Sequence, residues 1–418
     1  MRRLFLRPAA VLLAVALGIL AAAPPTPAAP ALPAASAEAV LRHLTVLTRQ
    51  MAPRPSGSPT YLRAAAYMEE QLRALGYEVE RQAFPFLYFE ARGSSFQIAG
   101  GTAFPNVVPE YSAATPPQGI EAPLVDAGVG LPEEVQQAGV AGRIALVRRG
   151  PAGMRFRDKV ENAAAAGAVG VVIYNNTADP VQQVTLLGPA RVPVVFISQA
   201  DGQRLIGLLR QGPVRVVLRV DTVTERRTTW NVIGRRAGRS PRSIVVGAHL
   251  DTAEVSPGAN DNGSGIAAAL ETARLLAAVP LDLSVEIVGF GAEERGLLGS
   301  AFFVGERGSR TAGMVNMDMV GHGMLTVGNG TGTGSLLDRA EQIAARLGLR
   351  LGVRFRLPGA SDHASFERAG IPTVFIHTGD DPLIHTPQDT LDRIDATLMA
   401  QAAQLAAAVA LEAAAVLR

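Results

Sequence analysis

Short apolar strands alternate with helices through the second half of the chain, and this alternation constrains the fold more than any other feature. The predicted strands lie within 243–251, 283–291, 313–321 and 372–379, and the predicted helices lie within 263–279 and 334–348. Apolar strands covered by helices indicate an open α/β sheet. We expect the Ala-rich stretch 396–418 to cover this sheet and not to span a membrane, because Gln401, Gln404 and Glu412 interrupt it.

Residues that can bind metal ions follow these strands. His249 and Asp251 end the first strand, Glu293 and Glu294 follow the second, and the remaining candidates are Asp261, Asp318 and His385. Ligands in open α/β sheets gather outside the carboxyl ends of the strands. Since these residues come from different strands, we expect them to converge at that edge.

The charges of this set suit two divalent cations. Asp261, Glu294 and Asp318, together with one hydroxide, would neutralise the +4 charge of two zinc ions. His249 and His385 would add neutral nitrogen ligands, and imidazole with carboxylate is a donor set that zinc accepts. Paired hydrolytic metals lie about 3.5–4 Å apart. The set therefore predicts a two-metal site for zinc or another divalent ion.

Each ligand can be given a place. We expect Asp261 to bridge the two ions, because it lies between Gly258 and Gly263 in a loop where the backbone can approach closely. His249 and Asp318 would complete one ion, and Glu294 and His385 would complete the other. Asp251, two residues after His249, is expected to accept the second N–H of that imidazole and to fix the ring.

The adjacent acids Glu293 and Glu294 are then expected to have different tasks. Glu294 would bind a metal. Glu293 would stay uncoordinated, take a proton from the attacking water and pass it to the leaving group as a general base. Two neighbouring negative charges are tolerated there because the cations outweigh their repulsion.

Each motif alone also has a purely structural explanation. Paired acids are common in the first turn of a helix, and "DNGSG" (261–265) is first of all a turn signal before a helix. A histidine after a strand is commonly a loop residue, and we keep His322, His363 and Asp362 in that structural class, although "SDH" (361–363) could line the cleft. Five ligand-type residues and a spare acid, each following an apolar strand, are harder to explain without a site.

The first half of the chain has two parts. Residues 56–84 predict a helix that ends at Gly76 and is followed by a strand. Between about 105 and 222, strands and helices form what we expect to be a separate inserted unit without any cluster of acids and histidines. The predicted division is 30–37 as a linker, 38–104 with 223–418 as one discontinuous domain, and 105–222 as the insert.

The N-terminus predicts export. Arg2 and Arg3 precede an apolar run, 9–23, which is followed by small residues and prolines. This order is typical of a signal peptide, here 1–29, and the run is shorter than the ~20 residues of a spanning helix. We therefore expect a periplasmic or extracellular protein without stable membrane association after cleavage. The chain has no cysteine, so it has no disulfides and no cysteine for a lipid anchor.

Net charge and composition argue against a nucleic-acid partner. The formal net charge is only +2, and Lys159 is the only lysine. Basic residues do not form a run interleaved with aromatic side chains, which is the usual electrostatic footprint of nucleic-acid binding. The predicted partners are peptides.

Five motifs in order resemble family 28 of the metallopeptidases: "GAHLDT", "GANDNGSG", "GAEERGLLGS", "NMDMVG" and "HTPQDT". The insert resembles a protease-associated (PA) domain through "VAGRIALVRRG" and "FRDKVENAAAAGAVGVVIYNN". The resemblance implies a zinc-exopeptidase fold, a mixed open sheet flanked by helices with an inserted β-rich PA domain. It also implies His249, Asp261, Glu294, Asp318 and His385 as metal ligands and Glu293 as general base.

The resemblance favours a secreted dizinc aminopeptidase. Two alternatives stay open: a carboxypeptidase or dipeptidase, with Arg354 or Arg356 as candidates for binding a carboxylate, and a metal-free receptor-like binding module. The sequence departs from the family at one position, because Ile384 stands where a tyrosine often precedes the last histidine. Either another donor or the metals would then stabilise the oxyanion.

Overall fold

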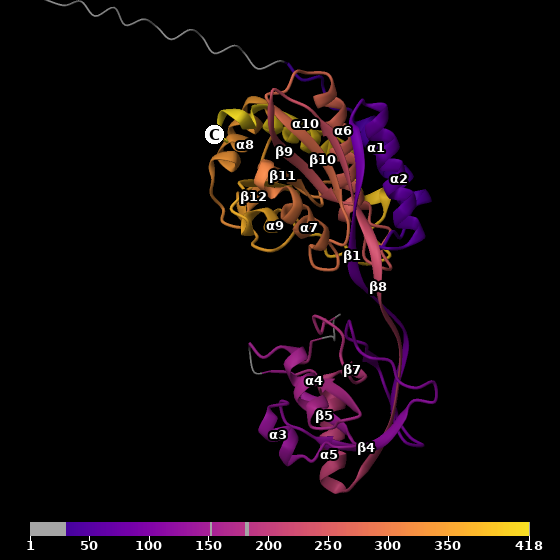
Figure 1. Cartoon of the computed structure of the whole chain (residues 1–418). Coiled ribbons are helices and arrows are strands. Elements are labelled where there is room, and N and C mark those ends of the chain that lie inside the picture. The colour runs from indigo at the N-terminus through magenta and orange to yellow at the C-terminus, as the bar shows by residue number, and fades with distance from the viewer. Residues whose placement is uncertain (1–30, 151–152, 180–183, 418) are drawn as a thin grey trace, which may run out of the picture.

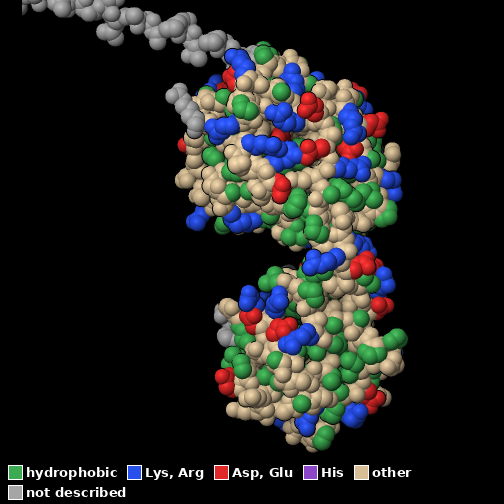
Figure 2. Space-filling view, viewed as in Figure 1, with side chains coloured by type: hydrophobic (Ala, Val, Ile, Leu, Met, Phe, Trp, Pro, Cys, Tyr) green, Lys and Arg blue, Asp and Glu red, His purple; other side chains and the backbone are tan. Residues whose placement is uncertain are grey.

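The chain forms two lobes joined by a long two-stranded ribbon. The computed structural model describes residues 31–150, 153–179 and 184–417, so the predicted signal peptide lies outside the described residues. Strands β1 (Glu78–Ile98) and β8 (Val214–Arg236) pair antiparallel from Glu78↔Arg235 to Ile98↔Val216 and run through both lobes. Figure 1 shows this ribbon as the connection between the lobes, and Figure 2 shows the narrow waist it makes.

The larger lobe is built on a mixed sheet in the order β13-β12-β14-β11-β9-β10-β8. Its strands are β9 (Ser240–His249), β10 (Leu283–Phe290), β11 (Thr311–Met317), β12 (Thr326–Asn329), β13 (Phe355–Arg356) and β14 (Thr373–His377). β9 pairs parallel with β10 and β11, and β11 pairs parallel with β14. β8 and β12 pair antiparallel with their neighbours β10 and β14. The carboxyl ends of the four parallel strands therefore share one edge.

Helices cover both faces of this sheet. The helices are α1 (Ala37–Gln50), α2 (Pro59–Ala74), α6 (Gly265–Ala277), α7 (Leu298–Arg307), α8 (Ser335–Arg346), α9 (His363–Arg368) and α10 (Ala396–Glu412). Ile244 and Val246 of β9 pack on the side of α2, α6, α8 and α10. Val245 faces the other way, toward Phe303 of α7 and Phe366 of α9. This alternation follows from the two-residue period of a strand and explains why β9 is apolar on both faces.

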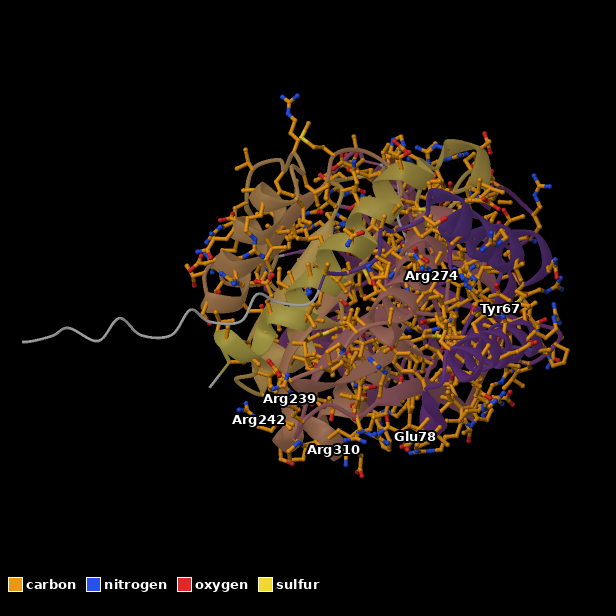
Figure 3. The ribbon with its side chains drawn as sticks, turned by 90° about the horizontal axis from the view of Figure 1, so that it is seen from above. Tyr67, Glu78, Arg239, Arg242, Arg274 and Arg310 are labelled. Carbon is orange, nitrogen blue, oxygen red and sulfur yellow. The ribbon has the colours of Figure 1, made fainter. Side chains whose placement is uncertain are left out.

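The C-terminal apolar helix belongs to this covering layer. Within the described residues, Ala396–Ala415 is the one helix long and apolar enough to cross a membrane, and 61% of its most apolar window is buried in the protein. Asp395 caps its first turn by accepting from the N–H groups of Thr397 and Leu398. Arg239 precedes β9, Arg242 lies in its first residues, and Arg310 precedes β11, so these three arginines, labelled in Figure 3, lie at the edge of the sheet opposite the carboxyl ends.

The smaller lobe contains the insert. Its sheet continues from β8 in the order β8-β4-β5-β6-β7-β3. The strands are β4 (Ile120–Asp126), β5 (Ile144–Arg148), β6 (Gly170–Tyr174), β7 (Val194–Ile197) and β3 (Asn106–Val107), and β2 (Ala103–Phe104) pairs with β1. The helices are α3 (Pro132–Gln137), α4 (Phe156–Ala165) and α5 (Gln199–Gln211). The insert thus contains both helices and strands around its own two apolar clusters.

The predicted α/β fold with an inserted unit is confirmed, but one element differs from expectation. Strand β8 continues without a break to Arg236, across the predicted domain boundary at 222/223. Residues 222–229 are polar except Val223, and a polar run of this kind is the sequence signal of a loop. Several of them are β-branched threonines, and these favour the extended ribbon that the structure shows.

The remaining short helical turns are η1 (Ala259–Ser264), η2 (Gly308–Arg310), η3 (Leu391–Arg393) and η4 (Ala413–Ala415). η1 matters most for function, because it carries Asp261 at the start of α6.

Candidate metal centre

The predicted ligands converge at the carboxyl edge of the parallel strands. His249 is the last residue of β9, Asp318 follows β11, and the Glu293–Glu294 pair follows β10. Asp261 enters from η1, and His385 enters from the loop after β14. The parallel register of β9 and β11 brings His249 and Asp318, 69 residues apart in sequence, to one place, and β10 between β9 and β8 adds the two glutamates.

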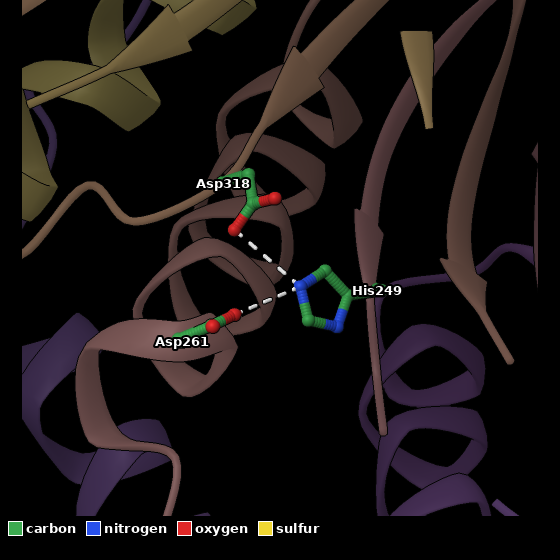
Figure 4. Close-up of side chains that lie close together, drawn as sticks. All are labelled: His249, Asp261 and Asp318. Atoms are coloured by element: carbon green, nitrogen blue, oxygen red, sulfur yellow. Dashed lines mark ion pairs between the residues drawn. The ribbon is translucent and has the colours of Figure 1, made fainter. Parts of the chain in front are cut away.

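The first group is His249, Asp261 and Asp318. His249 Nε2 lies 3.0 Å from Asp261 Oδ1 and 3.4 Å from Asp318 Oδ1. Figure 4 shows both carboxylates turned toward the same ring nitrogen. All three residues are buried, and their ligand atoms are close enough together to hold one ion.

The second group is Asp261, Glu294 and His385. His385 Nε2 lies 3.0 Å from Asp261 Oδ2 and 3.2 Å from Glu294 Oε2. These three ligand atoms could also hold one ion. Asp261 thus presents one oxygen to each group, as a bridging carboxylate would. The His385 side chain is 54% exposed, so this side of the centre is open to solvent.

The donor chemistry of the first group fits a cation between its atoms. His249 Nδ1 lies 3.1 Å from the main-chain oxygen of Asp251, an acceptor, so this nitrogen carries a proton. In a neutral ring Nε2 then presents a lone pair to two carboxylate oxygens, which is repulsive unless a positive charge lies between them. Asp318 Oδ1 is also buried without a hydrogen bond among the described residues. A metal ion would satisfy all of these lone pairs together.

The raised pKa values of His249 and His385 also indicate that this centre favours positive charge. Burial opposes a charge on His249, but the carboxylates of Asp318, Glu293 and Asp261 outweigh it and raise the pKa of the ring well above its usual value. Hydrogen bonds to Asp261 and Glu294 raise the pKa of His385 to about 11. Without metal, protons therefore occupy the places that cations would take.

Asp251 differs in detail from the expectation. Its main-chain oxygen, and not its carboxylate, is at hydrogen-bond distance from His249 Nδ1, because Oδ1 lies 3.8 Å away. Asp251 Oδ1 instead accepts from the N–H of Glu293 at 3.2 Å. Asp251 therefore orients both the histidine ring and the turn that carries the two glutamates.

The two glutamates have different surroundings. Glu294 Oε1 accepts from the N–H of Ala253 at 3.0 Å, and Oε2 faces His385. The carboxylate of Glu293 has no hydrogen-bond partner in the described part of the chain. Burial raises the pKa of Glu293 well above its usual value; His249 opposes this, and Asp362, Asp318 and Glu294 add to it. α7 begins only at Leu298, so the pair is not in the first turn of a helix.

The loop of Asp261 is fixed by two residues that the sequence did not single out. Asp389 accepts from the N–H groups of Asn260 at 2.7 Å and Asp261 at 3.0 Å. Arg54, fully buried, donates to the carbonyl oxygens of Leu250 at 2.8 Å and Gly258 at 2.9 Å. Gly258 has φ +62°, and a Cβ there would lie 2.6 Å from the carbonyl oxygen of Asp261, so the close approach expected for this loop is present.

His322, His363 and Asp362 were expected to have structural roles, and the two histidines have local partners while Asp362 does not. His363 Nε2 lies 3.1 Å from the carbonyl oxygen of Leu357, and its ring stacks on Phe375. His322 Nδ1 lies 3.4 Å from the carbonyl oxygen of Arg393. Asp362, in contrast, is fully buried without a hydrogen bond to its carboxylate among the described residues. Burial, opposed by His249 and reinforced by Asp318, raises the pKa of Asp362 to about 7.

Comparison with known proteins shows which protein family this chain belongs to. The family model described as peptidase family M28 matches residues 231–410, and the PA domain matches residues 120–205. The aminopeptidase YwaD of Bacillus subtilis is 33% identical over 398 residues, which cover 88% of this chain and 83% of that protein. The chain belongs to peptidase family M28.

Solved structures of M28-like aminopeptidases have the same fold. An aminopeptidase from Aneurinibacillus superposes with a TM-score of 0.81 at 33% identity, covering 91% of this chain and 94% of that one. A structure described as a zinc aminopeptidase from Bacillus subtilis gives 0.76 at 32% identity, covering 92% and 96%. The predicted membership of this peptidase family, with an inserted PA domain, is therefore confirmed. The role of each site residue in this M28 member stays a prediction.

Proposed function

We propose that this M28 peptidase is an exported aminopeptidase that holds two zinc ions and removes N-terminal residues from peptides. The single observation that carries the proposal is the position of Asp261, whose two oxygens each lie 3.0 Å from a different histidine. One carboxylate shared by two ligand groups suits a pair of metal ions held close together. The similarity to a protein described as a zinc aminopeptidase supports zinc as the metal.

Metal ions at this place would polarise the peptide carbonyl and lower the pKa of a water molecule. His249, Asp261 and Asp318 would hold one ion, and Asp261, Glu294 and His385 the other. The protein's own residues then supply orientation and proton transfer. Asp251 fixes the ring of His249 through its main-chain oxygen and the Glu293–Glu294 turn through its carboxylate.

Glu293 is the proposed general base. Its carboxylate is uncommitted, while the neighbouring Glu294 is bound to the Ala253 N–H and faces His385. It would accept a proton from the attacking water and donate it to the leaving amine.

An aminopeptidase fits the charges around the centre better than a carboxypeptidase. Arg354 donates to Asp338 and Glu341, so it is already paired, and Arg356 donates to the carbonyl oxygen of Gly330. Among the described residues, the cavity that borders Asp318 is lined by acidic and apolar side chains and by His377, with no arginine or lysine. A free α-amino group would be favoured there, whereas a C-terminal carboxylate would be repelled. The metal-free binding module is disfavoured because all five ligand positions hold a ligand-type residue.

Ile384, at the position where the family often has tyrosine, is one of the side chains that line this cavity. It offers no hydrogen bond to an oxyanion, so the proposal assigns that task to the metals. Export is proposed from the N-terminal sequence alone.

The proposal is tested with matched substrates. Purified zinc-loaded protein is given a peptide with a free α-amino group and the same peptide with an acetylated amino group. We expect release of the first residue from the free peptide and no release from the acetylated one. Hydrolysis from the C-terminal end, or equal rates on both peptides, would contradict the proposal. Peptidase activity in the culture medium or periplasm, with a mature N-terminus near residue 30, tests export.

A further inference from the structure

Arg295 directly follows the two glutamates of the metal centre in the chain, and its guanidinium group binds three separate segments. Nη1 lies 3.1 Å from Oε1 of Glu110 in the insert. Nη2 pairs with the carboxylate of Glu254 and donates to the carbonyl oxygen of Phe89 in β1 at 3.3 Å. Because the Arg295 side chain is largely buried, these charge-assisted contacts hold the guanidinium group in one place.

The segment that contains Glu254 also binds a candidate metal ligand. The N–H of Ala253 donates to Glu294 Oε1 at 3.0 Å, and Glu294 Oε2 faces His385. Ala253 and Glu294 therefore make one contact between the two segments. Glu254 and Arg295, the next residue in each segment, make a second contact. Losing the second contact would loosen the first, because both restrain the same pair of loops.

The insert fixes its own side of the contact through the main chain of Glu110. The N–H of Glu110 donates to the carbonyl oxygen of Val184 at 2.8 Å, and its carbonyl oxygen accepts from the N–H of Leu186 at 3.1 Å. The next residue, Tyr111, packs on Phe89 with ring centroids 5.6 Å apart. The position of the Glu110 carboxylate therefore depends on the position of the insert.

We propose that Arg295 is a positioning residue through which the insert sets the orientation of Glu294 and thereby the affinity for one zinc ion. That ion is the one proposed to bind Asp261, Glu294 and His385, so the inference rests on the proposed two-zinc function. Within the described residues, Arg295 has no ion pair or hydrogen bond with a candidate metal ligand, so it acts through Glu254 and through its own main chain. Loss of a partner that orients a metal ligand weakens metal binding on the order of 10- to 100-fold.

Zinc affinity tests this role independently of turnover. Metal-free protein is titrated with zinc in a calorimeter, which gives two dissociation constants. In Arg295→Gln one constant should rise on the order of 10-fold, and the other should stay as in the unaltered protein. In a Glu294→Gln background, which already lacks the carboxylate ligand, Arg295→Gln should not change the zinc binding that remains. A rise of both constants or of neither, or a further loss in that background, overturns the inference.

Two substitutions in the insert test whether the insert takes part. Glu110→Gln should raise the same constant as Arg295→Gln, but by less, because Glu254 still pairs with Arg295. Glu161→Gln is the matched control, since Glu161 pairs with Arg191 inside the insert at 2.9 Å, and it should leave both constants unchanged. No change in Glu110→Gln, or an equal change in Glu161→Gln, overturns the role of the insert.

Kinetics distinguish positioning from direct binding of the substrate. At limiting zinc, Arg295→Gln should have a lower kcat than the unaltered protein and the same KM, and saturating zinc should restore kcat. A raised KM that persists at saturating zinc would mean that Arg295 contacts the substrate, and it would overturn the inference.

The failure of this inference can be told apart from the failure of the proposed function. If the unaltered protein binds two zinc ions and cleaves free-amine peptides, but Arg295→Gln binds both ions equally well, only the role of Arg295 is wrong. If the unaltered protein does not bind two zinc ions, the proposed function is wrong as well.

Discussion

Arg295 Nη1 lies 3.1 Å from Glu110 Oε1, and this ion pair joins the insert to the turn that carries Glu293 and Glu294. Glu110 belongs to the insert, because its N–H donates to the carbonyl oxygen of Val184. Arg295 also pairs with Glu254 and donates to the carbonyl oxygen of Phe89 at 3.3 Å. The Arg295 side chain is only 9% exposed, so this ion pair between the two lobes is largely shielded from water on the arginine side.

A double-mutant cycle will show whether the Arg295–Glu110 ion pair stabilises the protein. Arg295→Gln should lower the free energy of unfolding because it leaves Glu110 without its partner, and Glu110→Gln should lower it because the largely buried Arg295 keeps only Glu254 as an ionic partner. The double variant should lose less than the sum, by on the order of 1 kcal/mol. Urea unfolding measures all four proteins. The exposed pair Arg155–Asp158 is the control, and a coupling no larger than that of the control would contradict the prediction.

Glu293→Gln should keep its metals and lose turnover. The amide has nearly the same shape but cannot accept the proton, so kcat should fall on the order of 10²-fold or more. Elemental analysis of the same sample should find zinc at the level of the unaltered protein. Glu294→Gln is the matched control, and it should lose zinc. Near-normal turnover in Glu293→Gln would contradict the proposed role of Glu293 as general base.

Asp261 should control both metal positions together. Because each of its oxygens faces a different histidine, Asp261→Ala should lower the zinc content at both positions, whereas Glu294→Ala should affect mainly one. Titration with zinc, followed by elemental analysis after gel filtration, gives the stoichiometry. Chelation should abolish activity of the unaltered protein, and added zinc should restore it. If Asp261→Ala still binds one zinc with undiminished affinity, its bridging role is wrong.

His43 should make stability fall in mild acid. Burial, reinforced by Arg42 and opposed by Glu271, lowers the pKa of His43 from 6.5 to about 4, and its Nδ1 lies 2.7 Å from the hydroxyl oxygen of Tyr67. Between pH 6.5 and 4 the unfolded chain binds a proton that the folded protein does not. The stability contributed by this histidine is therefore present above pH 6.5 and is lost as the pH falls, by at most about 1.4 kcal/mol per pH unit.

The measurement is urea unfolding at several pH values. His43→Asn removes the titrating group and keeps a polar side chain beside Tyr67, so its free energy of unfolding should depend less on pH in this window. The two proteins should converge in pH dependence above pH 7. An identical slope for both proteins between pH 6.5 and 4 would show that His43 does not titrate as its burial implies.

The parts of the centre that could be predicted from sequence are those fixed by strand order. His249, Glu294 and Asp318 follow apolar strands, and parallel pairing alone brings the ends of such strands together. The charge count required one of the two adjacent glutamates as a ligand, and the resemblance to the family assigned that role to Glu294 and the role of base to Glu293. The family comparison confirmed the fold and the membership in M28, while the individual roles of these residues still await experiments.

The residues that sequence reasoning missed act through the backbone of distant segments. Arg54 and Asp389 bind main-chain groups of the loop around Asp261, about 200 and 130 residues away in the chain, and neither lies at the end of a predicted strand. The difference at Asp251 has a similar origin. Sequence spacing placed this residue beside His249, but only the path of the loop decides that its carbonyl and not its carboxylate reaches the ring.

The paired strands β1 and β8 have a consequence for how such a protein can be rebuilt. They leave the catalytic lobe as adjacent antiparallel partners, so the insert enters and exits at one point. The order of the strands in the larger lobe does not depend on what lies beyond that point. A different inserted domain, or a short hairpin turn, could therefore be joined to β1 and β8 without changing the topology of the larger lobe.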